Sequence, residues 1–527
     1  MKKLLSADYL IIRNGYAKLL VLFLLFIAAI TLKDYGMSWD EMAQNEIGRK
    51  AYEYVTGENE DYRTFINNDY GVAFEMPVVY IQDKIIKTNP AKDYFKHAMV
   101  HLVFLTGLYA LYLVVKRLFG SYKWGLAAMV CMVISPRIYG DSFHNSKDIV
   151  LLAFWIVSFY TLIRALDKRT YWAWILHGIS TALLINIRIL GVLMIAVTVF
   201  VLLLDIITDP TKWKVYLVYF LVFMALLSIV LVITWPLLWQ NPLQNIVQAF
   251  NNMSHFRWDS SVLYRTGMIP ATLLPWHYLP TWISITTPEL FLVGFGVGVC
   301  MLVYQFVKNP LSFIQNTNNR MLAIAAGTVI APIAAIVLLH SVLYDAWRQV
   351  FFIYPFLIIT VLFAAKQVYD YITLQYPSHK KNVLIAYGVL LLPYVVQTVT
   401  LYPHENVYFN QLVSHKEGSL LATYEQDYWG TAAKQGWDYL LKQYPTDTLK
   451  VYPWVQPMMD NLELFPMEDQ KRVKMITDPA IITQADYFMT NYRWAFDKHP
   501  PNIPLGEKIF TIKKQNSEIF AIYKIKK

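Results

Sequence analysis

The sequence predicts a mostly α-helical, polytopic membrane protein with about eleven transmembrane helices and a small C-terminal extracytoplasmic α/β domain. Of its 527 residues, 56% are hydrophobic and only 16% are charged, a balance that soluble proteins of this length do not reach. Long apolar runs recur as far as about residue 402, many of them near the roughly 20 residues that a helix needs to cross about 30 Å of hydrocarbon. Residues 403–527 lack such runs and contain short alternating stretches instead, a pattern typical of strands.

Eleven membrane spans follow from that length rule, with edges uncertain by several residues. They fall near 15–32, 97–115, 124–136, 149–165, 172–187, 189–207, 215–236, 289–307, 321–341, 348–365 and 383–402. The third, fourth and fifth are shorter than the bilayer requires, which predicts tilted or re-entrant helices that meet their loops below the membrane surface.

The distribution of Lys and Arg predicts the orientation. With the N-terminus in the cytoplasm, the segments on that side carry seventeen Lys and Arg, whereas the short loops on the other side carry only Arg137, Lys147, Arg188 and Arg348. Basic residues concentrate on the cytoplasmic side of membrane proteins. An odd number of spans then places the C-terminal segment outside. The net charge of +9 therefore reflects topology and does not indicate a nucleic-acid partner, for which no binding module is recognisable.

Four stretches are predicted to lie on the outer side: about 33–96, 136–148, 237–288 and 403–527. The first and third contain amphipathic pieces such as residues 244–258, which favour helices along the membrane surface. In the last, residues 449–455, 486–494, 508–514 and 518–527 have the alternation of strands, and the final two predict a hairpin across Gln515, Asn516 and Ser517. Residues 1–402 and 403–527 are therefore predicted as two domains.

Charged side chains gather on this outer side. A charge at membrane depth costs roughly 3 kcal/mol on insertion scales, so each one requires an explanation. The group comprises Asp40 and Glu41 after the first span, Arg137, Asp141, His144, Lys147 and Asp148 between the third and fourth, Arg188 in the next outer turn, and Asp345 and Arg348 before the tenth.

Most of these residues also have a structural explanation. Asp40 and Glu41 could be an acidic pair that favours a helix N-terminus, and Asp148 could be the N-cap of the fourth span. Arg348 could anchor a helix at the interface. Arg188 is different, because a cation in a tight turn between apolar spans requires a carboxylate or an anionic ligand.

Taken together, carboxylates beside guanidinium groups suit attack on a sugar that a lipid phosphate carries. A carboxylate deprotonates the acceptor, and guanidinium groups bind the phosphate and stabilise the charge that develops on it. Such a donor needs no nucleotide, which fits the absence of a P-loop and of a GxGxxG motif.

Cys131 and Cys300 both lie in apolar runs and look like small core residues. No HExxH or CxxC spacing accompanies any His, so neither a metal nor a cofactor is predicted.

At these residues the sequence resembles the polytopic GT-C glycosyltransferases, in the bacterial branch similar to dolichyl-phosphate-mannose protein mannosyltransferases and to the lipid A aminoarabinose transferase. The resemblance covers nearly the whole chain. It is carried by Ser38-Trp39-Asp40-Glu41, Tyr70-Gly71, SPRIYGDSFHNSKD ending at Asp148, IRILG around Arg188, LYDAWRQVFFIYP around Arg348, and ENVYFN followed by YEQDYWG at 424–430. The Asp-Glu pair alone is a weak pattern, but its order with the second-loop Asp and eleven spans is much more specific.

The resemblance implies metal-independent, inverting transfer of a sugar from a polyprenyl-phosphate donor to a glycan, lipid or protein acceptor, at the outer face of a bacterial cytoplasmic membrane. Asp40 then corresponds to the catalytic base, Glu41 to its companion and Asp148 to an acid that orients donor or acceptor. We assign the phosphate to Arg137 and Arg188, with Lys147 and Arg348 as further members. Possible sugar or acceptor contacts are Tyr70, Asp141, His144, Asp427 and Trp429. The residues after Tyr70 read YGVAFEMP and lack the Lys-Pro-Pro of the lipid A enzyme.

Two questions stay open at this level. YEQDYWG could be an edge that contacts glycans, or a capped helix start packed on the membrane domain. A transporter or flippase of a lipid-linked glycan is the alternative function. That alternative predicts ionisable residues within several spans and an internal repeat, whereas the spans are unusually free of charge and the two halves do not resemble each other. The chemistry above further requires that residues 40, 148 and 188 converge around one chamber.

Overall fold

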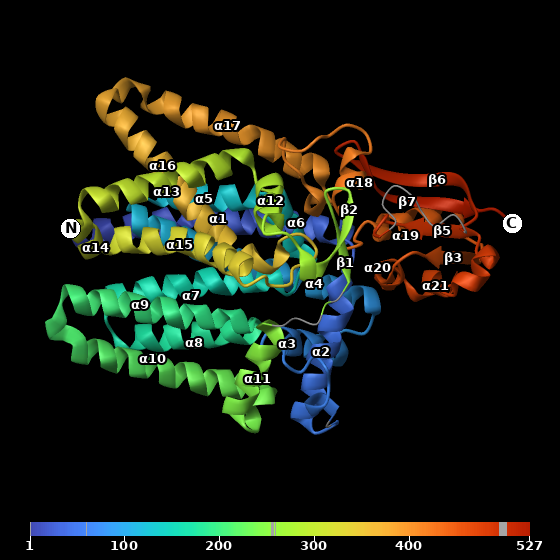
Figure 1. Ribbon diagram of the computed structural model, residues 1–527, viewed down its shortest axis with the longest axis horizontal. Coiled ribbons are helices and arrows are strands. Elements are labelled where there is room, and N and C mark those ends of the chain that lie inside the picture. Colours follow the sequence, from blue (N-terminus) through green and yellow to red (C-terminus); the bar gives the residue numbers. More distant parts are fainter. Residues whose placement is uncertain (1, 60, 255–257, 259, 495–502) are drawn as a thin grey trace.

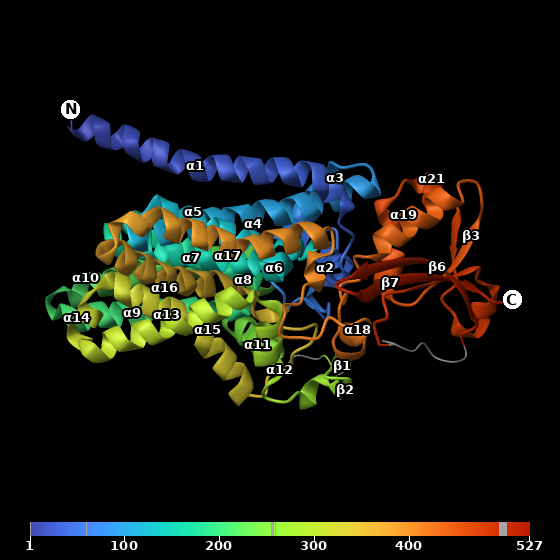
Figure 2. The ribbon, with the colours of Figure 1, turned by 90° about the horizontal axis from the view of Figure 1, so that it is seen from above.

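The computed structural model describes residues 2–59, 61–254, 258, 260–494 and 503–527. A long bundle of helices carries a small sheet, formed by the C-terminal region, at one end, and the N-terminus lies at the opposite end (Figures 1 and 2). We call the end of the bundle that faces the sheet the sheet end.

The predicted spans are present as helices. Nine described segments are long and apolar enough to cross a membrane: Asn14–Asp34, Asn89–Phe119, Asp148–Lys168, Ile189–Thr208, Pro210–Thr234, Glu289–Lys308, Thr317–Leu338, Arg348–Gln375 and Pro377–Leu401. Two shorter apolar helices, α5 (Tyr122–Val133) and α8 (Tyr171–Ile187), occupy the third and fifth predicted positions. The prediction of short helices is confirmed for these two. It is wrong for the fourth, α7 (Asp148–Lys168), which has 21 residues because the helix continues through its charged last turn.

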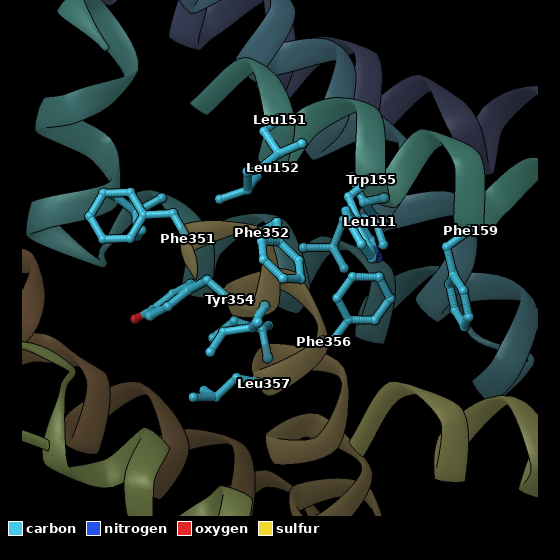
Figure 3. Close-up of a cluster of buried hydrophobic side chains, with 14 of the residues drawn as sticks. Leu111, Leu151, Leu152, Trp155, Phe159, Phe351, Phe352, Tyr354, Phe356 and Leu357 are labelled. Atoms are coloured by element: carbon cyan, nitrogen blue, oxygen red, sulfur yellow. The ribbon is translucent and has the colours of Figure 1, made fainter. Parts of the chain in front are cut away.

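The bundle is built around α7 and α16 (Tyr354–Gln375), preceded by the short turn η7 (Arg348–Ile353). The Trp155 ring of α7 stacks on Phe352 at 4.2 Å, and Phe159 meets Phe356 edge to face at 5.0 Å (Figure 3). By contrast, α10 (Trp213–Thr234) and α17 (Lys380–Leu401) bury few side chains and lie at opposite borders of Figure 1. In lipid, helices associate mainly by van der Waals packing, so interlocking aromatics define the centre.

Small residues allow a close helix contact between α4 and α7. Gly107 of α4 (Asn89–Phe119) faces Ala153 of α7, and a Cβ added at residue 107 would lie 2.7 Å from the Ala153 Cα atom. Helices in membranes approach most closely where both carry such residues. Of the two cysteines, Cys131 is buried, but Cys300 is exposed on α13 (Glu289–Lys308), so its prediction as a core residue is wrong. Only one face of α13 packs inward.

The connecting segments at the sheet end are themselves structured. They form α2 (Trp39–Thr56), α3 (Glu75–Lys84), α6 (Pro136–His144), α11 (Pro242–Ser254), the hairpin of β1 (Ser261–Tyr264) and β2 (Gly267–Pro270), and α12 (Tyr278–Thr286). The prediction of helices in 33–96 and 237–288 is therefore confirmed for the described residues, which leave out 60, 255–257 and 259, and their position along the membrane surface stays a prediction.

The C-terminal sheet has five strands in the order β4-β3-β5-β7-β6. These are β3 (Leu449–Pro453), β4 (Val473–Met475), β5 (Tyr487–Thr490), β6 (Leu505–Lys514) and β7 (Ser517–Ile525). β3 pairs in parallel with β4 and β5, whereas β7 pairs antiparallel with β5 and β6. The predicted hairpin is confirmed: Gln515 and Asn516 both have positive φ, as a tight hairpin turn requires. Helix α19 (Ala433–Gln443) covers the sheet through Gly436 and Phe520.

The contact between Gly107 and Ala153 makes a testable prediction. Replacing Gly107 with Ala should lower the thermal unfolding midpoint of the purified protein in detergent, because the added methyl group overpacks the α4–α7 contact at a cost of about 1–3 kcal/mol. Gly296→Ala in α13 is the matched control, since nothing lies within 4 Å of a Cβ there. Equal midpoints for the two variants would contradict the packing argument.

Candidate active site

Four predicted side chains meet at the sheet end. Asp40 lies in the first turn of α2, Asp148 is the first residue of α7, Arg188 follows α8, and Arg348 begins η7. Arg188 Nη1 donates to Asp148 Oδ1 at 2.6 Å. Arg348 Nη1 donates to Asp40 Oδ2 at 2.8 Å and to Asp148 Oδ2 at 3.2 Å. Residues 40, 148 and 188 therefore share one site, and the guanidinium of Arg348 joins the two carboxylates.

A third carboxylate extends this cluster into the C-terminal region. Asp345 Oδ2 accepts from Arg348 Nη2 at 3.1 Å, and Asp345 Oδ1 accepts from Arg493 Nη2 at 2.6 Å. Asp345 and Ala346 both have positive φ, a conformation that costs free energy for residues with a Cβ and is often held at functional sites. We call Asp40, Asp148, Arg188, Asp345, Arg348 and Arg493 the acid–guanidinium cluster. Arg493 was not predicted, because nothing in the local sequence around it marks it as part of a site.

Lys147 lies beside the cluster without an ion-pair partner among the described residues. Its Nζ lies 4.0 Å from the centre of the Tyr70 ring, and the residue is only 6% exposed. Burial, followed by the nearby charge of Arg188, lowers the pKa of the ammonium group. Asp40 acts on Lys147 only through its charge and forms no ion pair with it. A buried cation without a hydrogen-bonded carboxylate is costly, and an anionic ligand would lower that cost.

Asp40 is the accessible member of the cluster. Its side chain is 25% exposed, compared with 1% for Arg348 and none for Asp148. Burial alone would raise the pKa of Asp40, but the charges of Arg348 and Lys147 outweigh that effect and lower the pKa. The carboxylate is therefore ionised at neutral pH and can be reached from outside the cluster.

The position of Tyr70 depends on its neighbour Gly71. A Cβ at residue 71 would lie 1.5 Å from the backbone oxygen of Asn186, and the Ala73 N–H donates to Asn186 Oδ1 at 2.8 Å. The loop is thus held against the end of α8, two residues before Arg188. This contact explains why Tyr-Gly occurs here and how Tyr70 comes to lie under Lys147.

Glu41 has a structural environment different from that of Asp40. It is the third residue of α2, where it accepts from the Ser38 N–H at 2.6 Å in a capping box, and its other oxygen lies 3.0 Å from His97 Nε2. Such a box satisfies two backbone donors of the helix start. The helix-terminus explanation therefore applies to Glu41, and the structure does not bring it into the cluster as a second catalytic acid.

Arg137 also lies apart from the cluster. Its Nη2 donates to the Tyr408 carbonyl at 2.9 Å, and its guanidinium lies over the rings of Trp282 and Phe409. The side chain is 1% exposed. The assignment of Arg137 to the donor phosphate is therefore not supported; it ties the segment around residue 408 to the bundle.

The four predicted sugar contacts besides Tyr70 are buried as well. Trp429 Nε1 donates to Asp141 Oδ2 at 3.2 Å, and His144 meets the Trp429 ring edge to face. Asp427 accepts from the Thr431 and Ala432 N–H groups in the turn that precedes α19, and this buried packing favours the structural interpretation of YEQDYWG over a glycan-contacting edge. Trp429 supports the site indirectly, since Arg348 lies 4.5 Å above its ring.

Two structural explanations from the sequence are also corrected. Arg348 is not an interfacial anchor, because it is 1% exposed and lies inside the cluster. Asp148 is not the N-cap of α7 but its first residue, and its N–H donates to Asn145 Oδ1 at 2.9 Å.

Among the described residues, no group of three or more His, Cys, Asp or Glu could hold a metal ion.

Comparison with known proteins places this site in a family context. Residues 97–235, which include Lys147, Asp148 and Arg188, match the family described as dolichyl-phosphate-mannose-protein mannosyltransferase. No curated protein matches the chain.

Two solved structures of ArnT from Cupriavidus metallidurans align over 98% of this chain and 98% of their own. The apo structure has 12% sequence identity and a TM-score of 0.50. The structure bound to undecaprenyl phosphate has 12% identity and a TM-score of 0.47. These comparisons agree with the resemblance stated from the sequence: residues 97–235 match a mannosyltransferase family model, and the chain as a whole has a fold similar to that of ArnT.

Proposed function

We propose that this protein transfers a sugar from a polyprenyl-phosphate donor to an acceptor on the outer face of a bacterial cytoplasmic membrane, with inversion and without a metal. The observation that carries the proposal is the accessible carboxylate of Asp40, held by Arg348 at 2.8 Å beside the unpaired ammonium of Lys147. The matched family, whose description names dolichyl-phosphate-mannose, supports a lipid-phosphate sugar as the donor.

The donor phosphate is assigned to Lys147, Arg188 and Arg348. Four cations face three carboxylates in and beside the acid–guanidinium cluster, so this group of residues has a net positive charge. Arg188 is 13% exposed at its side chain and can turn part of its guanidinium toward a ligand. Guanidinium groups bind phosphate with two parallel hydrogen bonds, and these bonds are strong because both partners are charged.

Asp40 acts as the general base in this proposal. It takes the proton of the acceptor hydroxyl while the acceptor oxygen attacks the anomeric carbon, and the bond from that carbon to the phosphate oxygen breaks. Attack opposite the leaving group inverts the anomeric carbon. The phosphate gains one negative charge, which the cations stabilise. Because Arg348 serves both Asp40 and the phosphate, the charge growing on the leaving group raises the basicity of Asp40 as the proton moves.

The proposed orientation puts the sheet end outside. The excess of Lys and Arg predicted for the cytoplasm belongs to the opposite end of the bundle, and the cluster lies at the sheet end. Residues 403–527 are then an extracytoplasmic domain, and membrane lipids surround α10, α13 and α17. The acceptor is a hydroxyl-bearing glycan, lipid or protein that reaches this face.

A transporter or flippase is less well supported. A transported polar ligand requires ionisable groups exposed to a path through the membrane. The titratable His177 in α8 is instead fully buried, with ring nitrogens bonded to Thr161 and Thr198 at 3.1 and 2.9 Å. This network joins α7, α8 and α9 (Leu193–Thr208) as a structural contact.

The role of Asp40 can be tested by replacing it with Asn, which keeps the hydrogen bond to Arg348 but removes the base. Transfer should fall by about 10²- to 10⁴-fold while the protein remains folded, because Arg348 keeps its ion pairs with Asp148 and Asp345. The measurement is transfer of labelled sugar from a panel of undecaprenyl-phosphate hexoses and pentoses to envelope fractions of cells that lack the gene. Asp438→Asn, an exposed carboxylate paired with Lys442, is the control. Near-normal transfer by Asp40→Asn would remove Asp40 from the catalytic role.

Lys147→Gln makes a separate prediction. Removing this cation should raise the KM for the donor about tenfold or more, which is the loss of one charge-assisted hydrogen bond. It should also move the acid limb of the kcat/KM profile to higher pH, because Lys147 lowers the pKa of Asp40 and a base with a higher pKa is lost at higher pH.

The control for Lys147→Gln is Lys87→Gln, an exposed lysine in the same outer segment. It should change neither the donor KM nor the pH profile. An unchanged donor KM in Lys147→Gln would argue against phosphate binding by Lys147. The catalytic role of Asp40 would still be decided separately, by the Asp40→Asn variant.

A further inference from the structure

A polar cavity of about 130 Å³ lies at the sheet end, outside the acid–guanidinium cluster. It is formed where the end of α2 and the following segment meet η5 (Pro236–Trp239) and α11. The side chains that line it are mainly amides and tyrosines: Tyr54, Tyr62, Asn68, Gln240, Asn245, Gln248 and Asn252, with Arg63 and Asp69. None of these residues belongs to the cluster.

From this lining we infer that the cavity is a carbohydrate subsite that holds a sugar ring of the acceptor glycan. The inference rests on the proposed function and adds to it the class of acceptor and the place where it binds.

The lining offers acceptors and donors in fixed positions. Asn68, Asn245 and Asn252 each donate from Nδ2 to a protein oxygen: the Arg63 carbonyl, the Leu237 and Gln240 carbonyls, and Asp69 Oδ2. Their side-chain oxygens accept no hydrogen bond from the described residues and are available to hydroxyl groups. Arg63 Nη1 donates to Gln240 Oε1. Carboxamides and a guanidinium held in this way match the alternating donors and acceptors of sugar hydroxyls.

Aromatic rings supply the apolar part of the site. Tyr54 stacks on Tyr62 with ring centres 5.6 Å apart, and the Arg63 guanidinium lies 5.5 Å from the Tyr54 ring. Rings fixed by such contacts present apolar surface at a low cost in conformational entropy, and the C–H face of a sugar packs on surface of this kind. A cavity near 150 Å³ holds a ring the size of benzene, so this space takes the ring of one sugar only in part, and the sugar's hydroxyl groups extend through the open side of the cavity.

The place of the cavity indicates an occupant at the membrane surface. On α11, the exposed apolar residues Leu243, Val247 and Phe250 lie on one face, whereas Asn245, Gln248 and Asn252 line the cavity from the opposite face. Because only η5 separates α11 from the end of the span Pro210–Thr234, the apolar face of α11 suits the lipid boundary. The cavity therefore opens beside the headgroup layer.

The cavity also lies next to the proposed chemistry. Asp69 lines it, and the adjacent Tyr70 lies under Lys147. Helix α11 packs against η3 (Ile189–Val192), which follows Arg188. In the proposed function the donor phosphate and its sugar occupy the cluster. A second sugar site beside the cluster therefore suits the acceptor.

The first test measures sugar binding and requires no catalysis. Methyl glycosides of the common hexoses, N-acetylhexosamines and pentoses are added to the full-length protein in detergent, and binding is followed by saturation-transfer NMR. At least one should bind with a Kd on the order of 1–10 mM, as expected for so small a ligand. Gln248→Leu should weaken it about threefold or more, without a loss of stability, because Gln248 is exposed and bonds to no described residue.

Gln244→Leu is the matched control, since Gln244 is exposed on the same helix but does not line the cavity. It should leave sugar binding unchanged. Tyr54→Ala, which removes the aromatic surface, should weaken binding in the same way as Gln248→Leu. The absence of binding by every glycoside at about 50 mM, or equal binding by the wild-type protein and Gln248→Leu, would overturn the inference.

A second test separates the acceptor from the donor sugar. In the transfer assay, Gln248→Leu should raise the acceptor KM about threefold or more, with the donor KM and the hydrolysis of donor without acceptor unchanged. A raised donor KM would instead assign the cavity to the donor sugar and overturn the inference. Asp40→Asn should keep wild-type glycoside binding, so that a failure of the proposed catalytic role and a failure of this subsite are distinguishable.

Discussion

The structure depends most on one buried guanidinium, that of Arg348. Its Nη1 reaches Asp40 and Asp148, its Nη2 reaches Asp345, and its face lies against Tyr344 and Trp429. A buried charge is tolerated only when it is paired and hydrogen-bonded, and removing one partner of such a pair costs about 3–5 kcal/mol. The starts of α2, α7 and η7 must therefore meet at this point. Through Asp345 and Arg493 the C-terminal region is held there as well.

The rigid part of the helix bundle and the acid–guanidinium cluster occupy different places in the structure. The α7–α16 interface is built from interlocking aromatics such as Trp155 and Phe352 (Figure 3) and fixes the ends of the helices. The charged groups of the acid–guanidinium cluster lie where those helices meet their connecting segments, as is usual for binding and catalytic residues on a rigid scaffold. Only Asp40 and Arg188 keep appreciable exposure within the central salt bridges, so a ligand meets these two first.

Three residues predicted for catalysis, phosphate binding or sugar contact lie outside the acid–guanidinium cluster and have structural contacts, and the reason is similar for each. Glu41, Asp427 and Arg137 satisfy backbone groups: Glu41 accepts an N–H group at the start of α2, Asp427 accepts N–H groups in the turn before α19, and Arg137 donates to a carbonyl. The first N–H groups of a helix have no partner within the helix, and acidic side chains can accept hydrogen bonds from them. In a single sequence, an acidic residue that caps a helix looks the same as one that serves in catalysis. Asp40 and Glu41 are adjacent, yet one faces Arg348 and the other faces His97, because successive residues on a helix point in different directions.

The sequence by itself determined the helical class, the positions of the spans and the strands of the terminal hairpin. These depend on local properties: the apolar length that matches a bilayer, the alternation of side chains along a strand and the residues of a tight turn. It also singled out Asp40, Asp148, Arg188 and Arg348 as charges that needed partners. Only the tertiary structure decided which of them meet, that Arg348 is the centre and not an anchor, that Arg493 joins them, and that a polar cavity forms beside α11. Those outcomes depend on contacts between residues up to several hundred positions apart, such as Asp40 and Arg348, and local sequence carries no record of such contacts.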